Sequence, residues 1–226
     1  MTALEAMIAA AIGAEGPLRL DRYMALCLSH PRHGYYATRD PIGVDGDFIT
    51  APEISQVFGE LVGVWCAAAW AAMASPAAFN LVELGPGRGT LMADILRAAK
   101  VMPGFTEAAQ IHLVETSPIL KRMQAEKVPR AIFHNSIDTI CAAPTILVAN
   151  EFFDAIPIRQ FERRDGGWQE RVIGLEDNRL APGLIEAEDL GPQGSDGDII
   201  EFAPARAEIA VTIGQRLASH PGSALI

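Results

Sequence analysis

Residues 80–90, NLVELGPGRGT, decide the fold of this chain. An apolar run, LVEL, leads directly into three glycines at alternate positions, Gly85, Gly87 and Gly89, and the sequence TLMADILRAA that follows is compatible with a helix. A strand that ends in a glycine turn and enters a helix brings bare backbone and the positive end of a helix dipole against a ligand. The stretch therefore predicts a site for a nucleotide-like cofactor.

The spacing of the glycines separates the classes of nucleotide. A P-loop requires Gly-x-x-x-x-Gly-Lys-Ser/Thr, and no lysine stands near this turn. The dinucleotide fingerprint Gly-x-Gly-x-x-Gly requires its third glycine at position 90, which is Thr90 here. Glu83 would place a negative charge beside a pyrophosphate, whereas it suits a cationic ligand. The pattern favours S-adenosylmethionine, which carries a sulfonium and an ammonium group and no phosphate.

Two further expected strands end in polar residues. The second strand ends at Glu115, where a carboxylate can accept hydrogen bonds from both hydroxyls of a ribose. We expect Glu115 to bind the ribose, and a surface glutamate at a strand end is the simpler alternative. The residues after the third strand are candidates for contacts with the adenine, or else form an ordinary turn: Asn135, Ser136 and Asp138.

Length and composition are those of an α/β enzyme. The chain has 226 residues, of which 50% are hydrophobic, so it can bury a substantial core. The net charge of −10 argues against nonspecific binding to nucleic acid, which requires a basic surface. Three scattered cysteines make neither a disulfide framework nor a metal site, and neither a signal peptide nor a membrane span is expected. These features predict a cytoplasmic protein, of bacterial type, that binds no metal.

The order of the expected elements predicts two regions. Residues 1–75 read as a helical region, within which the aperiodic stretch 30–53 forms a loop over the cofactor. Its expected helices cover 4–12, 20–29 and 55–74. Residues 76–226 alternate between strands and helices, which predicts a Rossmann-like α/β domain with a parallel sheet.

An antiparallel insertion is expected at about residues 157–200. Two alternating segments there, IRQFERR and GWQERVIGL, are joined by Asp165-Gly166-Gly167, which is typical of a β-hairpin turn. An amphipathic helix at 203–219 follows, and 223–226 begin a fifth strand, inside which the chain ends. We therefore expect a C-terminally truncated sheet whose unpaired edge could pair two chains into a homodimer.

Three long segments carry a family resemblance: GYYATRDPIGVDGDFITAPEISQVFGELVGVW, VELGPGRGTLMADIL and VANEFFDAIPIRQF, at 34–65, 82–96 and 148–161. Together they resemble the MidA/NDUFAF7-type class I S-adenosylmethionine-dependent methyltransferases. The resemblance implies a seven-stranded methyltransferase fold, with S-adenosylhomocysteine as the product of the cofactor. For mitochondrial members it implies symmetric dimethylation of an arginine in a respiratory complex I subunit during assembly.

Methyl transfer from a sulfonium is an in-line displacement, so the enzyme must mainly align the nucleophile and exclude water. A guanidinium stays protonated, and carboxylates are needed to hold it. The fourth expected strand ends at Asn150 and Glu151, with Asp154 one turn further. We expect Glu151 and then Asp154 to be catalytic and Asn150 to contact the cofactor. Capping of the next helix by Asn150 and Asp154 is the alternative.

The loop before residue 55 supplies two more candidate carboxylates, Asp47 and Glu53. They either approach the substrate as part of a lid, which the resemblance favours, or belong to a turn and to the start of a helix. His30 and His33 have no third ligand and read as loop residues.

The leading functional hypothesis is a protein methyltransferase that uses S-adenosylmethionine and modifies arginine. A noncatalytic assembly factor that retains the cofactor fold is a second hypothesis, from a different class. A nicotinamide-dependent oxidoreductase is the third, and the residue at position 90 counts against it.

Overall fold

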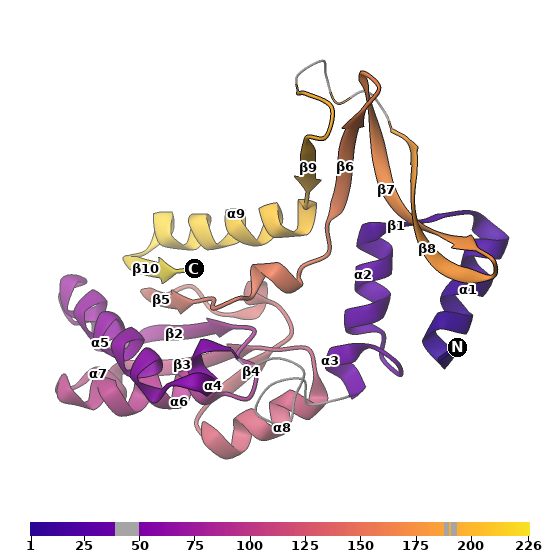
Figure 1. The fold of residues 1–226 in the computed structure, drawn as a ribbon. Helices are drawn as coiled ribbons and strands as arrows, with labels where there is room; N and C mark the ends of the chain where they lie inside the picture. The colour runs from indigo at the N-terminus through magenta and orange to yellow at the C-terminus, as the bar shows by residue number, and fades with distance from the viewer. Residues whose placement is uncertain (39–49, 188–189, 191–193) are drawn as a thin grey trace. The chain divides into compact units, whose positions relative to one another are not determined.

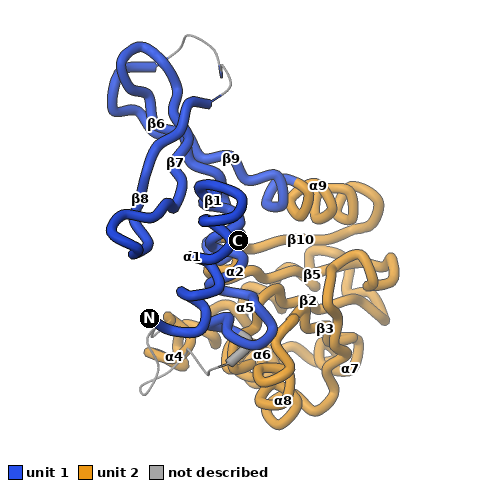
Figure 2. The backbone as a smooth tube through the Cα atoms, turned by 90° about the vertical axis from the view of Figure 1, so that its right-hand side faces the viewer, with its two compact units in different colours: residues 1–38, 154–207 blue, residues 39–153, 208–226 orange. Residues whose placement is uncertain are grey.

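The computed structural model describes residues 1–38, 50–187, 190 and 194–226. The chain forms two compact units, and each unit is built from two stretches of sequence (Figure 2). One unit combines residues 39–153 with 208–226, and the other combines 1–38 with 154–207.

The first of these units contains a parallel five-stranded sheet in the order β10-β5-β2-β3-β4 (Figure 1). Its strands are β2 (Phe79–Leu84), β3 (Ala109–Val114), β4 (Ile132–His134), β5 (Thr145–Val148) and β10 (Gly222–Leu225). Its helices are α4 (Ala51–Ile54), α5 (Gln56–Ala72), α6 (Thr90–Ala98), η1 (Ala99–Val101), α7 (Phe105–Ala108), α8 (Pro118–Lys127) and η2 (Ile137–Thr139). Most of α9 (Pro204–Ser219) also belongs here. The expected α/β fold is confirmed.

β2 is buried along its whole length because helices cover both faces of this sheet. Leu81 points to the face that packs with Cys66 of α5 and Ile95 of α6. Val82 points to the opposite face and belongs to a cluster with Ile213 of α9. The expected fifth strand is β10, which lies at the edge of the sheet and pairs with β5.

The second unit contains an antiparallel sheet with three helices. Its strands are β1 (Leu18–Arg19), β6 (Arg159–Arg164), β7 (Gly167–Glu176), β8 (Arg179–Glu186) and β9 (Ile199–Phe202). Its helices are α1 (Ala3–Glu15), α2 (Leu20–Ser29) and α3 (Tyr35–Thr38), and η3 (Phe153–Ala155) begins one residue before the unit resumes.

Two tight turns shape the antiparallel sheet. Asp165 and Gly166, between β6 and β7, both have positive φ, at 53° and 76°, as the expected hairpin requires. Asp177 and Asn178, between β7 and β8, also have positive φ, at 48° and 62°. This second turn adds a strand pairing that extends the insertion beyond the hairpin read from the sequence.

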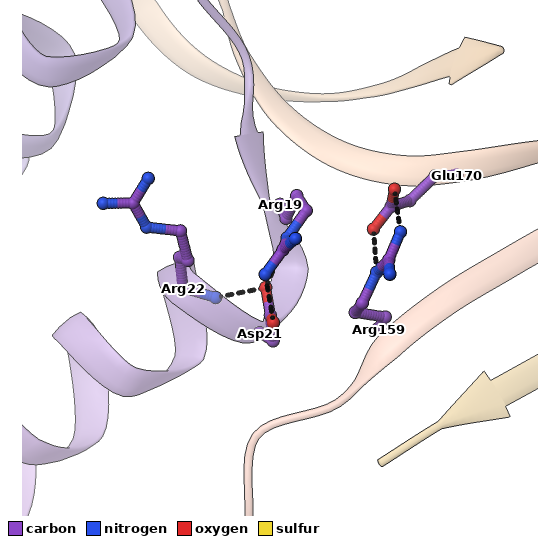
Figure 3. Close-up of polar contacts among 5 residues, drawn as sticks. All are labelled: Arg19, Asp21, Arg22, Arg159 and Glu170. Atoms are coloured by element: carbon purple, nitrogen blue, oxygen red, sulfur yellow. Dashed lines mark hydrogen bonds and ion pairs between the residues drawn. The ribbon is translucent and has the colours of Figure 1, made fainter. Parts of the chain in front are cut away.

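Charged pairs tie the strands of this unit together. Arg159 of β6 makes a bidentate ion pair with the buried Glu170 of β7, at 2.7 and 2.8 Å (Figure 3). At the start of α2, Asp21 pairs with Arg19 and accepts a hydrogen bond from the backbone N–H of Arg22 (Figure 3). The fork joins β6 to β7, with the Glu170 side chain 6% exposed and the Arg159 side chain 30% exposed.

The division into units differs from the expected boundary between residues 75 and 76. Helix α5 packs on the parallel sheet through Cys66 and Trp70, so it belongs with that sheet. Leu18 and Arg19 pair with Ile173 and Val172, so the N-terminal helices belong with the insertion. Pairing between segments distant in sequence sets this grouping, and a local pattern does not reveal it.

A chain of polar side chains crosses the parallel sheet on the face of α9. The Asn80 amide nitrogen donates to the Cys141 carbonyl at 2.8 Å, which leaves the Asn80 amide oxygen to accept from His112 Nε2 at 3.1 Å. The other ring nitrogen of a neutral His112, Nδ1, then accepts from His134 Nε2 at 3.0 Å. A neutral His112 is therefore held in the tautomer that carries its proton on Nε2.

Burial, followed by the charges of His134 and Arg216, lowers the pKa of His112 from 6.5 to about 4. Because the folded state disfavours the proton, this contribution to stability is complete above pH 6.5 and is lost as the pH falls towards 4. We expect the free energy of unfolding of His112→Gln to fall less between pH 6.5 and 4 than that of the unaltered protein, as measured by urea unfolding at several pH values. The same change at the exposed His33 should leave the loss unchanged, and equal profiles for His112→Gln and the unaltered protein would contradict the prediction.

Candidate functional site

The turn between β2 and α6 is built from glycines that adopt left-handed backbone angles. Gly85, Gly87 and Gly89 have φ values of 63°, 54° and 78°. Residues with a Cβ rarely adopt these angles, so the three glycines let the chain leave the strand and enter the helix within a few residues.

Neighbouring segments also approach two of these glycines closely. A Cβ on Gly85 would lie 2.8 Å from Cδ2 of Phe152, in the segment after β5. A Cβ on Gly89 would lie 3.2 Å from the Cα of Gln124, in the backbone of α8. The turn is therefore packed between two segments that follow other strands of the same sheet.

Glu83 lies next to the turn with its side chain buried among α5 and α6. Only 2% of the residue is exposed. This burial raises the pKa of Glu83 to about 8, although a hydrogen bond from the Met92 backbone acts in the opposite direction. Its Oε2 atom has no hydrogen-bond partner in the described part of the chain. A buried carboxyl group with an unused oxygen can receive a cation, which would restore its charge.

Glu115 follows β3 directly, as expected, and its carboxylate is held in place. Oε1 accepts hydrogen bonds from the backbone N–H groups of Thr116 and Ser117, both at 2.7 Å. Oε2 accepts from the side-chain amide of Gln124 at 3.3 Å. Burial raises the pKa of Glu115 more than these hydrogen bonds lower it. The group is thus a positioned acceptor at the carboxyl end of the sheet.

Glu53 of α4 reaches the glycine turn. It accepts a short hydrogen bond from the Thr90 hydroxyl and lies 3.7 Å from a guanidinium nitrogen of Arg88. Lys127 of α8 donates to the same hydroxyl at 2.5 Å. These contacts anchor α4 to the start of α6, and the substrate-facing role expected for Glu53 stays a prediction. Asp47 lies outside the described residues.

The three candidates after β4 make contacts with each other and with α8. Asn135 Oδ1 accepts from Lys121 Nζ at 2.6 Å. The Ser136 hydroxyl donates to Asp138 Oδ2 at 2.6 Å and accepts from the Asp138 backbone N–H at 3.3 Å. The segment is a polar turn at the same edge of the sheet, and its contact with an adenine stays a prediction.

The segment after β5 contains a strained residue, Glu151, three positions beyond the end of the strand. Asn150 is partly buried, and the exposed Glu151 has a φ of 53°, a backbone angle that non-glycine residues rarely adopt. Such strain, of about 1–3 kcal/mol, concentrates at functional sites. Asp154 is exposed and belongs to the unit with the antiparallel sheet.

One set of residues at this edge was missed by sequence reasoning: the stripe on α8 formed by Lys121, Gln124 and Lys127. Spacing of three places them on one face of the helix, and each contacts a different part of the site. The spacing in KRMQAEK was visible in the sequence. The burial of Gln124, which is 0% exposed, was not, because a polar side chain on a helix that also carries four charged residues is expected to face solvent.

The residues that the structure describes hold neither a metal-binding cluster nor a membrane-spanning helix. Among them, no group of three or more His, Cys, Asp and Glu side chains could hold a metal ion. Likewise, none of the helices placed there combines the length and the apolarity needed to cross a membrane.

Residues 61–226 match the family model described as "Putative S-adenosyl-L-methionine-dependent methyltransferase". Since the match covers well over half of the chain, the chain belongs to this methyltransferase family. The cofactor expected from the sequence, S-adenosylmethionine, is the cofactor of the family.

Among curated proteins, the chain is similar to protein arginine methyltransferase NDUFAF7 of several animals. It is 39% identical to the Drosophila melanogaster homologue over 76% of this chain and 45% of that protein. It is 35% identical to the human protein over 95% of this chain and 56% of that protein. The chain therefore spans about half the length of these relatives.

Solved structures share the fold. A protein of Burkholderia thailandensis bound to S-adenosyl-homocysteine superposes with a TM-score of 0.77, at 23% identity, over 93% of this chain and 58% of that one. A native crystal structure of a Burkholderia thailandensis protein superposes with a TM-score of 0.75, at 25% identity. The methyltransferase type of α/β fold is thereby confirmed.

The residues at the carboxyl edge fit the cofactor of the family. S-adenosylmethionine needs a partner for its positive charge, and the unpartnered Oε2 of the buried Glu83 can supply one. It also needs an acceptor for two ribose hydroxyls, and the oriented Glu115 can supply that.

The close packing at Gly89 gives a matched test. Gly89→Ala should lower the free energy of unfolding by about 3 kcal/mol, because the methyl group meets both a left-handed φ and the α8 backbone. Gly104→Ala, in the same unit at φ 87° with its nearest neighbour at 3.5 Å, should cost about 1 kcal/mol. Urea unfolding measures both, and equal losses would rule out a specific effect of α8.

Proposed function

We propose that this chain contains the S-adenosylmethionine site of a protein arginine methyltransferase. The observation that carries the proposal is the buried carboxyl group of Glu83, with an unpartnered oxygen, next to a turn of three left-handed glycines. Membership of the methyltransferase family supports the cofactor, and the names of the relatives support arginine as the target.

Each part of the cofactor has a proposed partner. The glycine turn approaches it with backbone, Glu83 balances its positive charge, and Glu115 accepts the ribose hydroxyls. The candidates for the remaining contacts are Asn135, Ser136 and Asp138 at the adenine and Asn150 near the reactive end. When bound, the cofactor supplies an electrophilic methyl group on a sulfonium.

The substrate guanidinium requires acidic partners, because it carries its charge at neutral pH. We propose Glu151 as the first of them, supported by its exposure and its strained backbone three residues after β5. The other candidates are Asp154, Glu53 and Asp47. A protein substrate in respiratory complex I stays a prediction from the family resemblance.

Two other functions make different predictions. A noncatalytic assembly factor would bind the cofactor and transfer no methyl group. A nicotinamide-dependent oxidoreductase is disfavoured because Thr90 stands where the third glycine should be.

Cofactor binding is tested by calorimetry of the purified protein with S-adenosylhomocysteine. We expect Glu115→Gln to weaken binding about 10-fold to 100-fold, because it replaces a charged acceptor of two hydroxyls by a neutral amide. Glu126→Gln, an exposed change on α8, is the matched control. Absence of binding by the unaltered protein would overturn the proposed cofactor.

Catalysis is separated from binding by Glu151→Gln. This change keeps the left-handed backbone and removes only the charge. We expect normal affinity for S-adenosylhomocysteine and a loss of about 100-fold in the rate of arginine methylation, measured by mass spectrometry of cells that express the variant from its own gene. Methylation at the normal rate would exclude Glu151 as the residue that aligns the guanidinium. If the partner protein assembles in unaltered cells while its arginines carry no methyl groups, the noncatalytic hypothesis is favoured.

A further inference from the structure

We propose that Gln124 is a positioning residue of the cofactor site, which joins the glycine turn to the ribose carboxylate and holds that carboxylate in place. The proposal rests on the proposed function, because it assigns Gln124 to the same site. It concerns a residue that does not itself have to touch the cofactor.

The hydrogen bonds of Gln124 carry the first step. Its side-chain amide nitrogen donates to the Gly87 carbonyl oxygen at 2.7 Å and to Glu115 Oε2 at 3.3 Å. An amide nitrogen has two hydrogens, so one side chain supplies both contacts. The bridge links the connection after β2 to the residue after β3.

The position of Gln124 is fixed by packing of the backbone. Its Cα is the nearest atom to a Cβ built on Gly89, at 3.2 Å, so α8 lies against the third glycine of the turn. Contacts of Lys127 with Thr90 and of Lys121 with Asn135 hold the same face of the helix one turn to either side. The amide of Gln124 therefore reaches Gly87 and Glu115 from a helix that is itself held in place.

Packing alone does not account for a glutamine here. The residue is fully buried, and its Oε1 atom has no hydrogen-bond partner among the residues that the structure places. An unsatisfied buried oxygen costs about 1–3 kcal/mol, which a leucine or methionine of similar volume would avoid. A donor to Glu115 and Gly87 is the property that those apolar residues lack.

The expected effect on Glu115 follows from the opposing influences of burial and hydrogen bonding on its pKa. Burial raises the pKa of Glu115, and the hydrogen bonds from Ser117, Thr116 and Gln124 lower it. Removal of the Gln124 donor should leave the carboxyl easier to protonate. A protonated Glu115 accepts the ribose hydroxyls less well, so binding should become weaker and more sensitive to acid.

The test compares Gln124→Leu with Gln124→Met and with the control Gln215→Leu, an exposed glutamine of α9. The first readout is the titration of the Glu115 carboxyl in cofactor-free protein, followed by carbon-13 NMR and assigned with Glu115→Gln. We expect its midpoint to rise by about one pH unit in both Gln124 variants and to stay unchanged in the control. The second readout is the affinity for S-adenosylhomocysteine, which should fall about 10-fold at pH 7, with the acid limb of binding shifted upward by about one unit.

The outcomes separate the two proposals. If the unaltered protein does not bind S-adenosylhomocysteine, the proposed function fails, while the titration still tests the link between Gln124 and Glu115. If the unaltered protein binds, and the variants show an unchanged Glu115 midpoint and unchanged affinity, the positioning role is overturned. A lowered melting temperature with an unchanged midpoint also overturns it, because a purely structural residue would behave in that way. If Gln124→Leu does not fold, the unbranched Gln124→Met provides the same comparison.

Discussion

The packing of α8 against Gly89 is the constraint on which the carboxyl edge of the parallel sheet depends. The absence of a side chain at Gly89 lets the α8 backbone come within a distance that a methyl group would obstruct. From there, α8 reaches the glycine turn, the carboxylate after β3 and the polar turn after β4. A single helix therefore coordinates three loops, and each loop contributes one part of the proposed site.

The sequence predicted the features whose causes are local. Glycines at 85, 87 and 89 with an acid before them, and an acid at the end of the next strand, are patterns within short segments, and the structure places them as expected. Asp165 and Gly166 similarly predicted the hairpin turn that the structure contains. The pairing of Leu18 with Ile173 and the burial of Gln124 depend on segments far away in the chain, and no local period records them. The contact of Glu53 with Thr90 was missed for the same reason.

Both faces of the parallel sheet bury a titratable group in the state that carries no charge. On the side of α5 and α6, burial raises the pKa of Glu83 to about 8, which favours the protonated acid at neutral pH. On the side of α9, burial lowers the pKa of His112 to about 4, which favours the neutral ring. The histidine is satisfied by its neighbours, whereas Glu83 retains an unused oxygen. An unpartnered buried oxygen needs an explanation, and the proposed cofactor supplies one for Glu83.

The pairing of β1 with β7 has a consequence for synthesis of the chain. Residues 1–38 are synthesised before the stretch 39–153, and their strand partner β7 follows that stretch. During that interval, Ile8 and Ile12 lack the strands of the insertion that complete their cluster, and they present apolar surface to the cell. The cluster of Ile8 and Ile12 is therefore completed only after β7 and β8 have been synthesised.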